Sequence, residues 1–292
     1  MSKLKFGSDP EFFASYQEDG EHYVLPPVFL RKYCGAKAKE NGSHPIYAKY
    51  GDTLVHEDGA AFEMSTPPSN DWKEMWGTLD DAKHQFEKKV LSKFSDVCDP
   101  ILYSIPAMHW QVSKWENEDQ DFHLSTIFGC DADQDVFNMS AKASVVDASL
   151  HPWRYAGGHI HVSGLKEIEK YPLRAIKSMV LTAGLACTAY SDVPDLEHER
   201  LYLYGRPGKF RLQKYSNKEV GVEYRTPSTR WTSNFDMAEK IFSWAEIGIN
   251  ALLAENILDR VESDIMEDAK KAILDVDQTK AKELLAYIQT NL

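Results

Sequence analysis

Two histidines separated by one residue are the strongest chemical signal in the chain. His159 and His161 lie in the segment AGGHIHVSG, which has the pattern of a β-strand. Because strand side chains alternate between the two faces of a sheet, both imidazoles should point to the same side and could converge on one ligand. A surface pair without a ligand is the alternative reading. The preceding Gly157 and Gly158 allow close backbone approach and favour a functional role.

Acidic residues in two other segments offer oxygen ligands for a hard metal ion. GSDPEFF supplies Asp9 and Glu11, which period-two alternation places on one face of a strand. HEDGAAFEMSTPP supplies Glu57, Asp58 and Glu63. Carboxylates scattered over separate strands suit Mg²⁺ or Mn²⁺, because magnesium is bound by few protein oxygens together with water and substrate phosphates. Any one of these acids could instead be a solvated charge.

Arginines gather in two segments of the last third of the chain. YGRPGKFR holds Arg206 and Arg211 on either side of a glycine-containing turn, and VEYRTPS places Glu223 and Arg225 on one face of a strand. The planar guanidinium fork suits phosphate or carboxylate groups. In an acidic protein these arginines could equally pair with Asp or Glu side chains.

The overall composition is typical of a globular protein. The 292 residues are 43% hydrophobic and carry a formal net charge of −12, which argues against a nucleic-acid partner. No apolar run is long enough to cross a bilayer and the start of the chain lacks a signal-peptide pattern, so we expect a cytoplasmic protein without a membrane partner. The four cysteines form no Cys-x-x-Cys pair, which predicts reduced thiols.

Common enzyme fingerprints are missing from the sequence. It contains no P-loop, no dinucleotide-binding glycine motif and no serine nucleophile elbow. Any chemistry would therefore depend on the acids, histidines and arginines described above.

The hydrophobic pattern places these residues on the strands of an α+β fold. Short β-like runs fill the first two thirds of the chain, at 11–16, 22–29, 60–65 and 101–112. A helix is predicted from an N-cap at Asp71 to about Phe94, and a second one over 173–190 that backs the sheet. Further helical patterns follow at 237–258, 261–274 and 278–292. We therefore expect a mainly antiparallel sheet with helices on one face, an open active face and a helical C-terminal tail.

The order of the motifs resembles one protein family, the phage-type carboxylate-amine ligases (COOH-NH2 ligase type 2). The segments that carry the resemblance span residues 6–231 and are GSDPEFF, DGAAFEMSTPP, FGCDADQDVFN, AGGHIHVSG, YGRPGKFR and VEYRTPS. That family belongs with glutamine synthetase and glutamate-cysteine ligase, whose curved antiparallel sheet holds ATP and divalent ions on its concave face. The resemblance implies a glutamine synthetase-like catalytic domain over residues 1–232 and, over 233–292, a helical segment packed on the same domain.

The resemblance also implies roles for individual residues. The implied metal ligands are Asp9, Glu11, Glu63, His159 or His161, and Glu223. The implied contacts to the transferred phosphate or the substrates are Arg225, Arg211 and Arg206. Pro10, Glu57 and Asp58 depart from a simple pattern and leave the ligand set open. Cys130, Asp131 and Asp133 match a family signature of no derivable role, and Cys130 is read as structural rather than nucleophilic.

These roles predict an ATP-dependent ligase that joins a carboxylate to an amine through an acyl phosphate. Its cofactors would be ATP and Mg²⁺ or Mn²⁺, its partners a small-molecule or peptide carboxylate and amine, and its location the host cytoplasm if the gene belongs to a phage. The site could be complete in a monomer or shared in an oligomer, as in glutamine synthetase relatives. The alternatives are a metal-dependent hydrolase using His159 and His161 with carboxylates, and a catalytically silent binding protein of the same fold.

Overall fold

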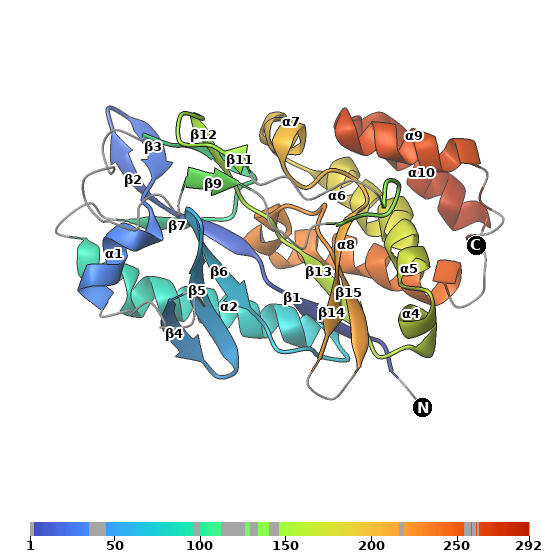
Figure 1. Cartoon of the computed structure of the whole chain (residues 1–292), viewed down its shortest axis with the longest axis horizontal. Helices are drawn as coiled ribbons and strands as arrows, with labels where there is room; N and C mark the ends of the chain where they lie inside the picture. Colours follow the sequence, from blue (N-terminus) through green and yellow to red (C-terminus); the bar gives the residue numbers. More distant parts are fainter. Residues whose placement is uncertain are drawn as a thin grey trace.

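Strands from distant parts of the chain form open, mainly antiparallel sheets with helices packed against them (Figure 1). The computed structural model describes residues 3–34, 45–95, 100–111, 126–128, 134–139, 146–215, 219–253, 258, 261 and 263–291. The architecture is the α+β class that the sequence predicted, with open sheets and a helical C-terminal tail.

In the described part of the chain, the strands fall into three sheets. The five-stranded sheet is antiparallel throughout and has the order β1 (Lys5–Ser8), β13 (Ile160–Ser163), β15 (Val220–Tyr224), β14 (Lys209–Lys214), β10 (Gln134–Asp135). The eight-stranded sheet has the order β12 (Trp153–Tyr155), β8 (Ala107–His109), β3 (Glu21–Val24), β2 (Glu11–Glu18), β6 (Ala61–Ser65), β5 (Thr53–Asp58), β4 (Ile46–Tyr50), with β7 (Ile101–Tyr103) beside β2. In this sheet β3 and β8 pair in parallel. A small antiparallel pair joins β9 (Ile127–Phe128) to β11 (Val146–Asp147).

The two large sheets meet where β1 runs into β2. The sequence predicted one strand carrying Asp9 and Glu11, but Asp9 and Pro10 lie between the two strands. Proline has no N–H to donate to a strand ladder, which explains the break. The Pro10 carbonyl still accepts the N–H of Met64, at 3.0 Å, so the segment continues along β6. Asp9 and Glu11 are thereby held beside the same neighbouring strand.

The helices lie mainly in the middle and the last third of the chain. They are α1 (Pro27–Cys34), α2 (Trp72–Lys89), α4 (Lys166–Lys170), α5 (Pro172–Met179), α6 (Leu185–Tyr190), α7 (Pro194–Leu203), α8 (Phe235–Ile247), α9 (Ser263–Leu274) and α10 (Gln278–Asn291). Shorter 3₁₀ turns occur at Leu91–Phe94 and Thr229–Ser233, and π turns at Val180–Gly184 and Gly248–Leu253.

Helix α2 begins where the sequence predicted. The carboxylate of Asp71 accepts the backbone N–H of Lys73 at 2.8 Å, which satisfies one of the free donors at the helix start. Trp72, Met75 and Leu79 recur at three- and four-residue spacing and are buried. The α-helix ends at Lys89, and the 3₁₀ turn that follows carries the chain to Phe94.

Helices α5 and α6 back the five-stranded sheet as one helix interrupted by a π turn. Alternation along β13 and β15 turns Val162, Val222 and Tyr224 to the buried side, where α4 and α5 pack against β15. Gly184, in the π turn, leaves room for the Tyr224 ring, because a Cβ there would lie 2.4 Å from the Tyr224 hydroxyl. The opposite face of these strands is thereby left for polar side chains.

The C-terminal helices pack on the sheet-forming part of the chain. Phe242 of α8 stacks on Trp72 of α2 at a ring distance of 5.7 Å and meets Phe6 of β1 edge-on, also at 5.7 Å. Trp231 contacts the same ring at 5.0 Å. This packing is consistent with a helical segment that belongs to one core, although the division at residues 232 and 233 stays a prediction.

Two strand predictions were wrong in their extent. The run 22–29 is a strand only over β3, since Pro27 begins helix α1, a position that suits the fixed φ angle of proline. The run 101–112 is split into β7 and β8, with Pro106 between them. At both places a proline ends or interrupts the strand, and residue 112 lies outside the described residues.

Within the described part of the chain, every helix is too short or too polar to cross a membrane. Cys187 is a free thiol, and burial raises the pKa of its side chain, so it stays protonated. The side chains of the other three cysteines lie outside the described residues.

The tight junction at Gly158 allows a stability prediction. A Cβ there would lie 2.3 Å from the carbonyl oxygen of Ser228 and 2.6 Å from Trp231 Nε1. We expect Gly158→Ala to lower the free energy of unfolding by about 2 kcal/mol or more in urea titrations, since overpacked cores must shift backbone. Gly77→Ala is the matched control, because this glycine of α2 has open space around its Cβ position and alanine should stabilise the helix. An unchanged unfolding midpoint for Gly158→Ala would contradict the prediction.

Candidate functional site

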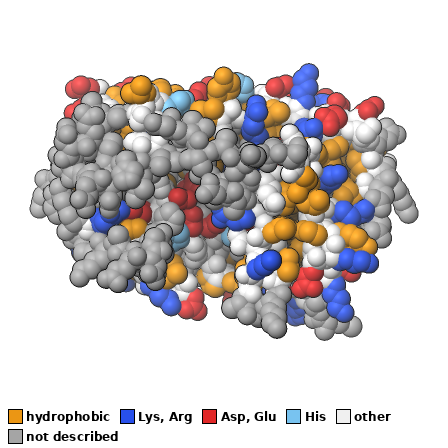
Figure 2. Space-filling view, viewed as in Figure 1, with side chains coloured by type: hydrophobic (Ala, Val, Ile, Leu, Met, Phe, Trp, Pro, Cys, Tyr) orange, Lys and Arg blue, Asp and Glu red, His pale blue; other side chains and the backbone are white. Residues whose placement is uncertain are grey.

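Strand register brings the predicted site residues into two rows. In the five-stranded sheet, His161 of β13 lies directly opposite Glu223 of β15, which lies opposite Arg211 of β14. In the eight-stranded sheet, Glu11 of β2 lies opposite Glu63 of β6. Residues that face each other across a ladder project from the same face, so each row gathers its side chains. Figure 2 shows acidic side chains near the middle of the molecule with histidine and basic side chains beside them.

The first row forms a cluster of three potential metal ligands with a second histidine behind it. Asp9, His161 and Glu223 offer donor atoms that lie within 4.8 Å of one another. Asp9 Oδ1 lies 3.1 Å from His161 Nε2 and 3.1 Å from His159 Nδ1. His159 Nδ1 also lies 3.4 Å from Glu223 Oε1. The prediction that both imidazoles point to one side is confirmed.

The second cluster consists of carboxylates. Glu11, Asp58 and Glu63 offer oxygens within 4.8 Å of one another. Glu57, which the sequence could not separate from Asp58, lies elsewhere: its carboxylate binds the Arg31 guanidinium and accepts the Tyr47 hydroxyl at 2.9 Å. Of the three competing acids in this segment, the structure places Asp58 and Glu63 beside Glu11.

The arginines differ in their relation to these clusters. Arg225, one residue after β15, is buried and its guanidinium contacts the Glu223 carboxylate. Arg211 Nη1 lies 3.5 Å from Glu223 Oε2. Arg206 is exposed, and its backbone carbonyl accepts a hydrogen bond from the Thr226 hydroxyl at 3.0 Å. Arg211 and Arg225 therefore flank the first cluster, whereas Arg206 is fixed through its backbone.

Three residues that the sequence did not single out also belong to the site. Tyr204 extends its hydroxyl to Glu11 and His159, at 3.1 and 3.2 Å. The Gln213 amide binds the Glu223 carboxylate, and His56 Nε2 lies 3.0 Å from Glu63 Oε1. Alternation along β14 places Gln213 on the same face of the strand as Arg211, and this pattern could have predicted that Gln213 belongs to the site. Nothing in the sequence pattern indicates the role of Tyr204.

Opposite charges balance the first cluster. Burial alone would raise the pKa of Asp9, but the adjacent His161 and His159 outweigh it and hold the pKa far below its usual range. Burial likewise opposes a charge on His161, yet Asp9 and Glu223 raise its pKa to about 9. The pKa of His159 is instead lowered, by burial and by the charge of Arg225. This cluster holds its carboxylates ionised with a proton on His161.

Like charges dominate the second cluster. Burial and the charge of Asp58 raise the pKa of Glu11 to about 8. Burial and the charge of Asp9 raise the pKa of Glu63 to about 7, although His56 opposes the shift. Crowded carboxylates of this kind favour the ionised form only when a cation balances them.

The donor set fits a hard divalent cation. The two clusters together consist of five carboxylates and one imidazole, a set that matches the oxygen-rich coordination of Mg²⁺ or Mn²⁺. His161 Nε2 is buried and makes no hydrogen bond, although it lies close to Asp9 and Glu223. Once it has lost its proton, this nitrogen, which faces two carboxylates, is placed to act as a ligand.

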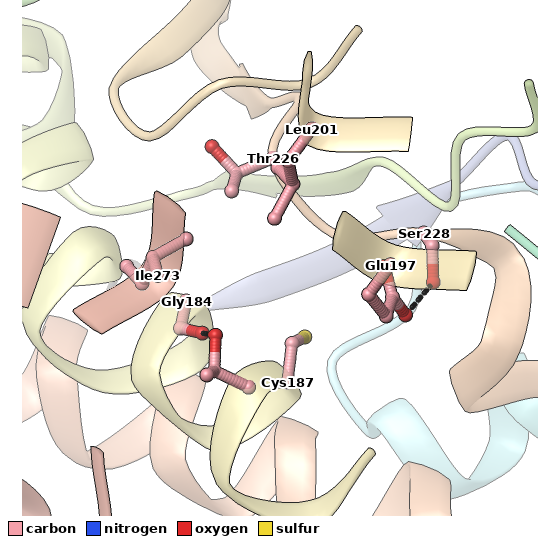
Figure 3. Close-up of a pocket in the computed structure, with 8 residues that line it drawn as sticks. Gly184, Cys187, Glu197, Leu201, Thr226, Ser228 and Ile273 are labelled. Carbon is pink, nitrogen blue, oxygen red and sulfur yellow. Dashed lines mark hydrogen bonds between the residues drawn. The ribbon is translucent and has the colours of Figure 1, made fainter. Parts of the chain in front are cut away.

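A small cavity lies among helices α6, α7 and α9 and the segment after β15 (Figure 3). Glu197 of α7 faces Ser228 there, and the Ser228 hydroxyl donates to the Glu197 carboxylate. The residues that line the cavity are Gly184, Cys187, Thr188, Glu197, Leu201, Thr226, Ser228 and Ile273. None of them belongs to either carboxylate cluster, so the cavity marks packing between α6, α7 and the segment after β15.

Cys130, Asp131 and Asp133 lie outside the described residues, so their predicted signature is not placed.

The sequence matches no family model and no curated protein. Among solved structures, the chain is similar to a bifunctional glutathione synthetase from Pasteurella multocida, with 11% sequence identity and a TM-score of 0.39. The match covers 99% of this chain and 49% of that protein, so this chain spans about half its length. A likeness this low carries no argument about fold or activity, and the family resemblance of the motifs stays a prediction.

The raised pKa values predict how stability depends on pH in the absence of metal. Glu11, Glu63 and His161 prefer their protonated forms in the folded state, so the stabilisation they give at low pH is lost as the pH rises through about 7 to 9. Asp9 and Glu223 have lowered pKa values and would lose their contribution only in acid. In EDTA, we expect the melting temperature to fall between pH 7 and pH 9.

Mg²⁺ should reverse this trend, because ionised carboxylates bind the cation. At a concentration of 100 Kd, a ligand that binds only the folded state adds about 2.7 kcal/mol. Glu63→Gln should raise the stability of the metal-free protein and reduce the Mg²⁺ effect, as measured by calorimetry. Asp52→Asn, at an exposed carboxylate, removes the same charge and should do neither. A melting temperature that rises from pH 7 to pH 9 in EDTA would refute the assignment.

Proposed function

We propose that the protein is an ATP-dependent ligase that uses Mg²⁺ and joins a carboxylate to an amine. The observation that carries the proposal is the presence of two acidic clusters together with two arginines, one on β14 and one directly after β15. Phosphoryl transfer needs cations around the phosphate oxygens far more than it needs a protein nucleophile. A site built from acids and arginines supplies that environment.

The proposed reaction proceeds in two displacements. An oxygen of the substrate carboxylate attacks the γ-phosphorus of ATP, and ADP leaves, which gives an acyl phosphate. The nitrogen of the amine then attacks the acyl carbon, phosphate leaves, and the nitrogen loses a proton. The first step turns a poor acyl donor into a good one, and the energy comes from ATP. Small molecules and peptides that carry the two groups are candidate substrates.

The residues of the site have distinct tasks in this scheme. Asp9, His161 and Glu223 would hold one ion, and Glu11, Asp58 and Glu63 a second. Bound ions neutralise charge on the phosphate oxygens during transfer. Arg225 and Arg211, beside Glu223, would orient the transferred phosphate, and Arg206 at the exposed edge would contact phosphate or substrate.

The arrangement of the histidines argues against a zinc hydrolase. Catalytic zinc usually has three protein ligands, commonly two or three of them imidazoles. Here His159 Nδ1 lies against Asp9 and its Nε2 faces Tyr204, so both of its nitrogens have partners. His161 is then the one histidine of the metal-ligand set, and its Nε2 faces the carboxylates of Asp9 and Glu223. A hard cation with oxygen ligands is the better fit.

Calorimetric titration tests the proposal. We expect ATP, or a non-hydrolysable analogue, to bind only with Mg²⁺ present, and the affinity to fall about tenfold or more in Glu223→Gln and Arg225→Ala, since each removes a buried charge-assisted contact. Glu21→Gln, at an exposed acid of β3, is the matched control and should bind as the wild type does.

Nucleotide binding should then be followed by a screen of carboxylate and amine pairs for ADP release. Failure of the nucleotide to bind with either Mg²⁺ or Mn²⁺ would reject the ATP-dependent reaction. Nucleotide binding without ADP release from any pair would favour a catalytically silent binding protein.

A further inference from the structure

Tyr204 lies between the first cluster (Asp9, His161, Glu223) and the second cluster (Glu11, Asp58, Glu63). Its hydroxyl donates to Glu11 Oε1 at 3.1 Å and accepts from Arg225 Nη2 at 3.4 Å. It also lies 3.2 Å from His159 Nε2. One phenol oxygen thus contacts Glu11 of the second cluster, Arg225 and His159.

Glu11 is held from two sides. Its Oε2 accepts the backbone N–H of Gly157 at 2.6 Å, and its Oε1 accepts the Tyr204 hydroxyl. Two donors on different oxygens fix the plane of a carboxylate, so its remaining lone pairs point in a set direction. Without the phenol, the carboxylate could rotate about the single contact to Gly157.

The ring of Tyr204 is itself held in place by Arg200 of α7. The guanidinium carbon of Arg200 lies 5.1 Å from the centre of the ring. Arg200 is fully buried and donates to the carbonyls of Thr226 and Pro227, at 2.8 and 3.1 Å. Gly205 permits this packing, since a Cβ there would lie 2.4 Å from Arg200 Nη2.

Helix α7 binds the segment that follows β15 through a second residue as well. The Ser228 hydroxyl donates to the buried Glu197 carboxylate of α7, as Figure 3 shows. Helix α7 therefore holds both Tyr204, which directly follows its last residue, and the chain that carries Arg225. Movement of either one relative to the other would break buried contacts.

We propose that Tyr204 is a positioning residue, whose hydroxyl sets the geometry between Glu11 and Arg225 while Arg200 sets the place of its ring. The inference rests on the proposed function, in which Glu11 binds a metal ion and Arg225 contacts the transferred phosphate. Loss of the hydroxyl leaves the ring, the packing on Arg200 and the charges intact. It removes the contacts of the hydroxyl to Glu11, Arg225 and His159.

Tyr204→Phe tests this role with two readouts. The first is the affinity for Mn²⁺ alone, measured from the free-ion signal in electron paramagnetic resonance, which requires no ATP reaction. We expect it to weaken about tenfold or more, the usual effect of losing a residue that orients a metal ligand. The second is the Mg²⁺ dependence of ADP release, in which the half-saturating concentration should rise by a similar factor. Tyr202→Phe, at an exposed ring two residues earlier, is the control and should match the wild type.

The outcomes separate the two proposals. Equal Mn²⁺ affinity in wild type and Tyr204→Phe would overturn the positioning role, whatever the enzyme does with ATP. Weakened Mn²⁺ binding in the variant, with no ATP turnover by the wild type, would support the positioning role and reject the ligase reaction. An unchanged melting temperature in EDTA supports positioning, and a large fall there, with unfolding of the variant, would overturn it in favour of a purely structural role.

Discussion

The crowding of buried carboxylates is the constraint on which the rest of the structure depends. Asp9, Glu11 and Glu223 are buried, and Asp58 and Glu63 lie close by. Removing a carboxylate from water is costly unless a cation or hydrogen-bond donors compensate. In the first cluster His161 and Arg225 provide compensation within the protein. In the second, burial and neighbouring carboxylates raise the pKa values of Glu11 and Glu63, so groups of the protein compensate these charges only in part.

Placing these charges on strands gives them a rigid support. The ladder through β13, β15 and β14 fixes the row of His161, Glu223 and Arg211, and the other face of the same strands is packed against α4 and α5. A shift by one residue in register would turn the acids into the apolar layer. Hydrophobic packing on one face of the five-stranded sheet thus offsets the free-energy cost of the crowded charges on its other face.

Helix α7 adds a second support, which acts from the side of the sheet. Its buried Arg200 and Glu197 bind the backbone and the side chain of the segment after β15, and the residue after the helix is Tyr204. Burying the charge of Arg200 costs free energy, which the hydrogen bonds from its Nη1 and Nη2 to backbone carbonyls offset in part. These contacts fix the segment that carries Arg225, whose guanidinium lies against Glu223.

Much of the fold and the main chemical residues followed from local sequence patterns. The Asp71 cap and its apolar spacing defined α2, and alternation correctly turned His159 with His161, and Glu223 with Arg225, toward common sides. These features depend only on backbone periodicity and on neighbours within a few residues. Only the tertiary structure separated Asp58 from Glu57, which is neutralised by Arg31, and revealed Tyr204, which meets Glu11 across 193 positions of sequence. Such partners are set by strand pairing and helix packing between distant segments, and no local period records them.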